Sequence, residues 1–177
     1  MKEYTYKVCL FGAGGVGKTS LTLRYMTGLF DNEIKLTMGA NIHVKEIEQN
    51  DKKIMLQIWD FGGEDQFKLL LPVYSHGSAG GIFMFDLTRF STLKSIPEWI
   101  NLFQEGLEGD EHKIPLLMVG GKKDLLEQLS VSEEDAEQYA RRYGCFDYVE
   151  CSSKEGENIS TIFERLIREI MTRLDIE

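Results

Sequence analysis

Hydrophobic residues occur along this chain in two kinds of pattern that follow one another. Continuous apolar runs occupy positions 8–11, 81–85 and 114–119, and such runs are typical of strands buried on both faces of a parallel sheet. On either side of Asn50-Asp51, apolar residues instead alternate with polar ones, which predicts a hairpin. One antiparallel strand at the edge of the sheet follows from that hairpin.

Between the strand-like runs, apolar residues recur every three or four positions and predict helices. One helix is expected over 93–107, where Pro97 is compatible only with the first turn. Another is expected over 136–143, with Ser132 as its capping residue. The longest apolar stripe consists of Ile159, Ile162, Phe163, Leu166, Ile167, Ile170 and Leu174. Together the patterns predict an α/β fold with a six-stranded, mostly parallel sheet, one antiparallel edge strand and about five flanking helices.

Composition favours one cytoplasmic domain over residues 1–177. A chain of 177 residues with 42% hydrophobic residues can bury a substantial core but leaves no room for a second domain. The net charge of −9 repels phosphate polymers, so we expect no nucleic-acid partner. Cys9, Cys145 and Cys151 lack metal-binding spacing and are expected to be buried thiols. We expect no membrane anchor, because residues 172–177 contain neither a cysteine nor a basic cluster.

The most specific motif lies directly after the first apolar run. The segment from Gly12 to Thr19 reads GAGGVGKT and matches the pattern GxxxxGK[ST] of a phosphate-binding loop in full. Its glycines allow backbone N–H groups to surround a phosphate, and the helix that follows adds positive potential. Lys18 is expected to reach the terminal phosphates, and the Thr19 hydroxyl to bind Mg²⁺. The expected phosphate-binding residues are Gly14, Gly15, Val16, Gly17, Lys18, Thr19 and Ser20.

A phosphate-binding loop does not select the base of the nucleotide, so the remaining motifs decide. They are Thr37 with Gly39, then WDFGGE at 59–64, GGKKD at 120–124 and CSSK at 151–154. In this order, over essentially the whole chain, the motifs resemble the Ras superfamily of small GTPases, and its Rab branch in particular. The resemblance implies a molecular switch that binds GTP or GDP with Mg²⁺. It also implies slow hydrolysis of GTP to GDP and phosphate, assisted by an activating protein.

On the base side, the resemblance implies that the carboxylate of Asp124 accepts hydrogen bonds from the guanine N1–H and amino group, donors that adenine lacks at these positions. Lys122 would lie along the base, and the backbone N–H of Ser153 would face the guanine carbonyl oxygen. Phe30 would pack on the base or ribose edge, although an ordinary core position is the alternative for this residue. The base-side residues implied are Phe30, Lys122, Asp124, Ser152, Ser153 and Lys154.

On the phosphate side, the resemblance implies that Thr37 meets Mg²⁺ and the γ-phosphate only in the triphosphate state, while Asp60 holds Mg²⁺ through water. The backbone N–H of Gly63 would contact the γ-phosphate. Loss of that phosphate would release two loops, 30–41 and 62–74, through which effectors, exchange factors and activating proteins would bind a monomeric protein. The implied catalytic residues are Lys18, Thr37, Gly63 and Glu64, and the implied metal ligands are Thr19, Thr37 and Asp60.

Three departures from the family pattern affect these expectations. Gly121 stands where the family has an asparagine that bonds the base and ties its loop to the phosphate loop, so nucleotide would be held less firmly. Glu64 replaces the glutamine that orients the attacking water, which leaves the rate of hydrolysis open. Phe61-Gly62 replaces the Thr-Ala of Rab proteins.

Two other functions are compatible with parts of the sequence. Glu64 and Gly121 also fit a scaffold that holds GTP or GDP without turnover. A metabolic kinase would use the same phosphate loop, but it would need an arginine-rich lid, and the arginines here fall mostly on helical patterns. The switch is therefore the preferred interpretation, with recruitment to membranes left to partner proteins.

Overall fold

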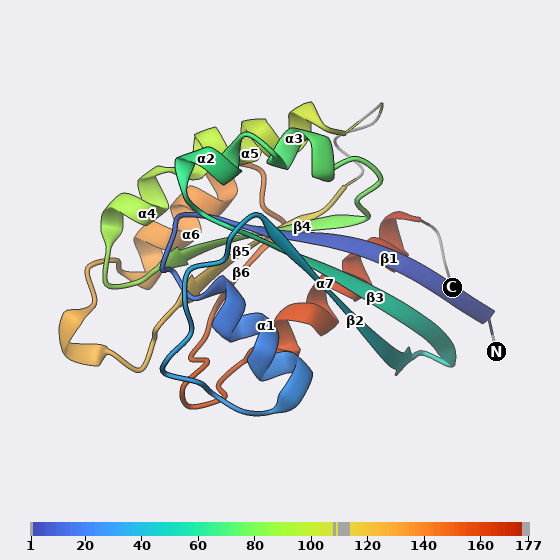
Figure 1. Cartoon of the computed structure of the whole chain (residues 1–177), viewed down its shortest axis with the longest axis horizontal. Helices are drawn as coiled ribbons and strands as arrows, with labels where there is room; N and C mark the ends of the chain where they lie inside the picture. Colours follow the sequence, from blue (N-terminus) through green and yellow to red (C-terminus); the bar gives the residue numbers. More distant parts are fainter. Residues whose placement is uncertain (1, 108, 110–113, 175–177) are drawn as a thin grey trace.

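The computed structural model describes residues 2–107, 109 and 114–174, within which six strands form one sheet in the order β2-β3-β1-β4-β5-β6 (Figure 1). Strand β2 runs antiparallel to β3 at the edge of the sheet, and every other pairing is parallel. The mostly parallel sheet with one antiparallel edge strand is thereby confirmed. The strands are β1 (Lys2–Phe11), β2 (Ala40–Gln49), β3 (Lys52–Phe61), β4 (Gly80–Asp86), β5 (Leu116–Gly121) and β6 (Asp147–Glu150).

Helices cover both faces of the sheet (Figure 1). The α-helices of the described residues are α1 (Lys18–Thr27), α2 (Asp65–Lys68), α3 (Leu71–Tyr74), α4 (Phe90–Lys94), α5 (Ile96–Glu105), α6 (Glu133–Arg142) and α7 (Ile159–Arg173). Helices α1 and α7 pack with Val8, Leu10 and Met84 on one face, whereas α3 to α6 pack with Phe11, Phe83 and Phe85 on the other. None of the described helices is long and apolar enough to cross a bilayer.

The local sequence accounts for where several elements begin and turn. Pro97 lies in the first turn of α5, and the hydroxyl of Ser132 accepts a hydrogen bond from the amide of Asp135 at the start of α6, both as predicted. Asn50 and Asp51 have φ values of 51° and 57°, which suit the tight turn of the predicted hairpin. These three predictions are confirmed.

Several details differ from the sequence patterns. The helix expected over 93–107 is divided, with Leu93 in α4 and with α5 running only from Ile96 to Glu105. The apolar stripe of α7 is buried as predicted except for Leu174, which follows the last helical residue and is 52% exposed. Helices α2 and α3 were not predicted, because four residues each are too few to produce a helical period. The tail segment 172–177 is described only as far as residue 174, so the expectation about its last three residues lies outside the described residues.

The fold places the carboxyl ends of the parallel strands at one edge of the sheet, where ligands of such folds bind. The phosphate loop follows β1, and Asp60 is the second-last residue of β3. Asp86 and Gly121 are the last residues of β4 and β5, which pair with each other there. Segments that are far apart in the sequence therefore meet at this edge.

Candidate functional site

The phosphate loop joins β1 to α1 and is in close contact with backbone on both sides. A Cβ atom at Gly12, where φ is 146°, would overlap the carbonyl oxygen of Met84. A Cβ atom at Gly63 would overlap the amide nitrogen of Gly14. Only glycine fits at these two positions, and residue 63 of the second mobile loop consequently lies directly against the phosphate loop.

Lys18 is buried at the start of α1, with 5% of its surface exposed. Its Nζ donates hydrogen bonds to the carbonyl oxygens of Gly12, at 2.7 Å, and Ala13, at 2.8 Å. Burial lowers the pKa of Lys18 to about 8, with the charge of Asp60 opposing this shift and that of Arg89 adding to it. The ammonium group is thus fixed by the loop, and it has a third N–H to offer a phosphate.

Thr19, Thr37 and Asp60 meet beside this lysine, although they come from three separate segments. The hydroxyl of Thr19 donates a hydrogen bond to Oδ2 of Asp60 at 2.6 Å and shares another with the hydroxyl of Thr37. Asp60 is fully buried, and burial raises its pKa while the hydrogen bond from Thr19 opposes the shift. Its second oxygen, Oδ1, is also buried and accepts no hydrogen bond within the described chain.

This cluster fits a magnesium ion. Its hydroxyl and carboxylate oxygens are hard ligands of the kind that Mg²⁺ prefers, and the orphaned Oδ1 of Asp60 is a buried acceptor that a water or cation would satisfy. The described residues contain no group of three or more His, Cys, Asp or Glu side chains able to hold a metal. A site with few protein ligands matches Mg²⁺, which usually keeps several waters and shares phosphate oxygens.

Two adjoining cavities bring together most of the predicted nucleotide-binding residues. The first, of about 180 Å³, is lined by residues that include Gly14, Gly15, Lys18, Thr19, Thr37, Gly63 and Glu64. The second, of about 330 Å³, is lined by residues that include Val16, Phe30, Met84, Asp124, Ser153 and Lys154. Both cavities share Gly17, Ser20 and Lys122. The shared walls join a phosphate-binding part to a part large enough for a base.

Ser152 and Phe30 are placed in informative ways. Ser152 is fully buried and does not line the second cavity; its hydroxyl donates a hydrogen bond to Oδ1 of Asp124 at 2.7 Å. Its contribution is therefore to orient the Asp124 carboxylate. Phe30 lines the cavity and is only partly buried, outside both hydrophobic cores, which favours contact with a ligand over the alternative of a core position.

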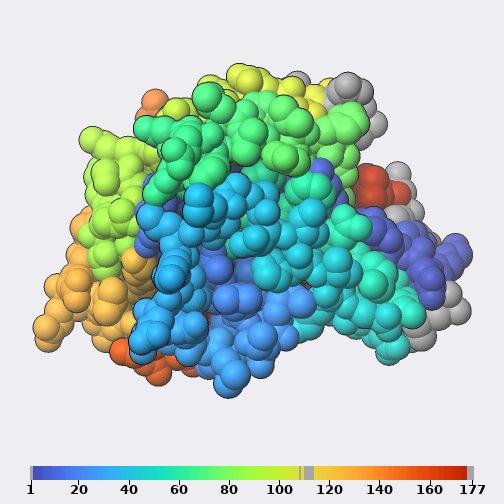
Figure 2. All heavy atoms as spheres, in the orientation of Figure 1, coloured from blue at the N-terminus to red at the C-terminus, as the bar shows by residue number. Residues whose placement is uncertain are grey.

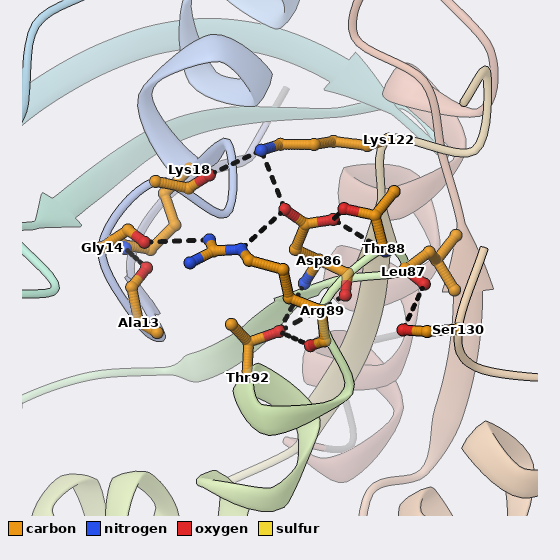
Figure 3. Close-up of polar contacts among 11 residues, drawn as sticks. Ala13, Gly14, Lys18, Asp86, Leu87, Thr88, Arg89, Thr92, Lys122 and Ser130 are labelled. Carbon is orange, nitrogen blue, oxygen red and sulfur yellow. Dashed lines mark hydrogen bonds and ion pairs between the residues drawn. The ribbon is translucent and has the colours of Figure 1, made fainter. Parts of the chain in front are cut away.

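Sequence reasoning missed a polar network around Asp86 (Figure 3). The buried carboxylate of Asp86 pairs with Nζ of Lys122 at 2.8 Å and with Nε of Arg89 at 3.1 Å. Lys122 also donates to the carbonyl oxygen of Gly15 at 2.8 Å, and Nη2 of Arg89 donates to that of Gly14 at 3.0 Å. Two cations anchored on one carboxylate thus hold the outer side of the phosphate loop.

The electrostatics of Asp86 agree with this role. Burial alone would raise its pKa, but hydrogen bonds from Lys122, Thr88 and Arg89 hold the pKa below its usual value. The sequence carried one signal for the network, namely an acidic residue at the end of a continuous apolar strand. Arg89 precedes α4 in an extended conformation and is thus one of the arginines outside the helices.

The two predicted mobile loops are in contact with each other. The amide of Gly62 donates a hydrogen bond to the carbonyl oxygen of Gly39 at 2.7 Å. A Cβ atom at Gly62 would lie 2.5 Å from the carbonyl oxygen of Thr37 and 2.9 Å from a ring carbon of Phe67. This lack of space explains why glycine stands at position 62, while Phe61 beside it is buried in the core.

Comparison with known proteins gives matches over nearly the whole chain. The sequence profile of the Ras family matches residues 7–172. The Ras-related protein Rab-19 of Rattus norvegicus is 32% identical to this chain over 97% of this chain and 77% of its own length. For the Ras-related protein Rab-8B of Homo sapiens, the identity is 33% over 98% of this chain and 82% of that protein. The similarity thus includes every element that contributes to the two cavities.

Proposed function

The chain belongs to the Ras family of small GTPases and is Rab-like, and from this premise we propose which of its residues bind and hydrolyse the nucleotide. It is a switch that binds GTP or GDP with Mg²⁺ and hydrolyses GTP to GDP and phosphate. The observation that best supports the residue assignment is the joining of the two cavities along Gly17, Ser20 and Lys122. Chromatography of the nucleotide released from the purified protein tests it, since only a guanine nucleotide agrees with the assignment.

We propose that the amides of the phosphate loop and the ammonium group of Lys18 bind the phosphates. Thr19 and Thr37 would ligate Mg²⁺ directly, and Asp60 would do so through water. The ion supplies positive charge that offsets the charge developing on the phosphates during hydrolysis. On the base side, Asp124 would read the guanine edge with its carboxylate oriented by Ser152. The relatives do not favour the alternative of a scaffold without turnover.

The contact between the two mobile loops supports their use as one partner-binding surface. Figure 2 shows residues of the 30–41 segment beside those of the 62–74 segment on one face of the molecule. Large apolar side chains are exposed there and on the adjoining β2, namely Leu36, Met38, Ile42, Val44, Leu69 and Val73. Apolar groups exposed together are typical of protein interaction sites. We propose that effectors, exchange factors and activating proteins bind there to a monomeric, one-domain protein that works in the cytoplasm and is recruited to membranes by partners.

Glu64 is expected to make intrinsic hydrolysis slow. It lines the phosphate-side cavity, where a carboxylate lies close to phosphate charge and cannot donate a hydrogen bond to the transferring phosphoryl group. We expect the wild type to turn over on the timescale of minutes to hours, and Glu64→Gln to raise the single-turnover rate by about 10-fold or more. A wild-type rate above about one per second, or a severalfold decrease in Glu64→Gln, would show that Glu64 is a working base.

Arg89 is expected to slow the release of nucleotide by restraining the phosphate loop. Arg89→Ala removes the hydrogen bond to the carbonyl oxygen of Gly14 and one of the two cations on Asp86. Because this side chain is 45% exposed, we expect a modest effect, an increase of about 3- to 10-fold in the rate of GDP release. Arg89→Lys is the matched control, since it keeps the charge but lacks the forked donors. Equal release from wild type and Arg89→Ala would exclude such a restraint.

A further inference from the structure

The position that lacks the family's asparagine is filled by another side chain. Gly121 at the end of β5 and Met84 in β4 lie on the same face of the sheet, because Met84 pairs with Val119, two residues before Gly121. A Cβ atom at Gly121 would lie 2.5 Å from the terminal methyl carbon, Cε, of Met84. It would also lie 3.2 Å from the carbonyl oxygen of Val16. The methyl group of Met84 therefore occupies the space in which a side chain at position 121 would begin.

The same methyl group reaches the phosphate loop and the base-side cavity. A Cβ atom at Gly17 would be in ordinary contact with it, at 3.5 Å. Met84 is 1% exposed and belongs to the core that contains Val16 and Leu21, yet it also lines the cavity shared with Asp124. One flexible apolar side chain thus joins the end of β5, the phosphate loop and the wall of the base site. Methionine suits such an irregular gap because its unbranched chain adapts to it.

We propose that Met84 is a specificity-determining residue of the nucleotide site, where its methyl group replaces the missing carboxamide as the contact between the base loop and the phosphate loop. This inference rests on the proposed function. In the proposed binding mode, the carboxylate of Asp124 accepts hydrogen bonds from the N1–H and amino group of guanine. The backbone N–H of Ser153 donates to the guanine carbonyl oxygen. The acceptor next to that carbonyl is the ring nitrogen N7. Glycine at position 121 has no side chain, and the methyl group of Met84 that fills the space beside it cannot donate a hydrogen bond. Neither residue therefore offers N7 a hydrogen bond.

Two consequences separate this inference from the expectation based on sequence alone. Restoring the family residue by Gly121→Asn would be expected from sequence to tighten binding. The structure predicts a smaller gain for the single substitution, because Cβ must first displace the flexible Met84 methyl group and would also lie 3.2 Å from the carbonyl oxygen of Val16. The methyl group would be pushed into the base cavity. Shortening the neighbour by Met84→Val would make room for the asparagine.

The test measures dissociation of GDP and of 7-deaza-GDP, in which a C–H group replaces N7, from wild type, Met84→Val, Gly121→Asn and the double variant. Wild type should bind the two nucleotides within about 2-fold of each other, since no hydrogen bond to N7 is lost. Gly121→Asn should release GDP at a rate closer to that of the wild type than the double variant does, because the Met84 methyl group must be displaced. The double variant should release GDP more slowly than either single variant and should prefer it over 7-deaza-GDP by about 5- to 10-fold.

Met118→Val is the matched control for Met84→Val, because Met118 is an equally buried methionine in the core on the opposite face of the sheet. It should leave both dissociation rates unchanged. A wild type that binds GDP more than about 5-fold better than 7-deaza-GDP, or additive effects of the two substitutions, would overturn the inference while leaving the proposed function intact. Absence of GDP binding to the wild type would overturn both.

Discussion

Lys18→Ala is expected to abolish tight binding of GDP and GTP. The carbonyl oxygens of Gly12 and Ala13 hold the ammonium group of Lys18 against the phosphate loop, where we propose that it binds the phosphates. One hydrogen bond from the remaining N–H of this cation to a phosphate oxygen contributes about 1.5 to 3 kcal/mol, so we expect the affinity to fall by at least about 10- to 100-fold. Titration with fluorescent GDP in the presence of Mg²⁺ measures the loss.

The control for this substitution must separate loss of binding from loss of fold. Lys52 is also a buried lysine, with 8% of its surface exposed, but it lies at the start of β3, away from the strand ends that form the site. Lys52→Ala should therefore bind nucleotide as the wild type does. Circular dichroism should show that Lys18→Ala keeps its secondary structure. Unchanged affinity in a folded Lys18→Ala protein would contradict the assignment of the phosphate loop.

Asp124→Asn is expected to change the preferred base from guanine to xanthine. Xanthine carries a carbonyl group where guanine carries its amino group, so an amide side chain can donate to it whereas a carboxylate cannot. The Ser152 hydroxyl, 2.7 Å from Oδ1 of Asp124, holds the side chain in one orientation and makes the discrimination sharp. We expect the affinity for GTP to fall by about 10²- to 10⁴-fold and XTP to become the better ligand.

Competition between GTP and XTP for the purified variants measures this exchange of specificity. Asp147→Asn provides a matched control, because that carboxylate pairs with Arg165 at 2.7 Å and lines neither cavity of the nucleotide site. It should retain the wild-type preference for GTP. If Asp124→Asn also retains that preference, the base is read by another group.

The parts of the site that the sequence predicted are those whose chemistry is local or fixed by strand order. Gly12 to Thr19 is a contiguous loop, so its pattern contains the whole phosphate cradle. Asp60 lies at the end of β3 and Asp124 shortly after the end of β5, and the carboxyl ends of parallel strands meet at one edge of the sheet. The β2–β3 hairpin and helices α5, α6 and α7 were predictable because each carries its own period, and β1, β4 and β5 because each contains a continuous apolar run.

The parts that escaped prediction depend on the space between distant segments. Arg89 contacts Gly14 across 75 positions of sequence, and nothing near Arg89 indicates that partner. Ser152 belongs to a nucleotide-binding motif, yet only the structure places it behind Asp124. In the sequence, Met84 is one more apolar residue of a buried strand. Only the structure shows that its methyl group fills the space beside Gly121. Packing of this kind has no periodicity from which it could be inferred.

The absence of space for a side chain at Gly62 links the positions of the two predicted mobile loops. The carbonyl groups of Thr37 and Gly39 both lie against this one residue, the first by steric contact and the second by a hydrogen bond of 2.7 Å. A retreat of the first loop would therefore withdraw a neighbour from the second, so we expect the two loops to change together. We therefore expect the two loops to report one shared state of the nucleotide rather than two separate ones.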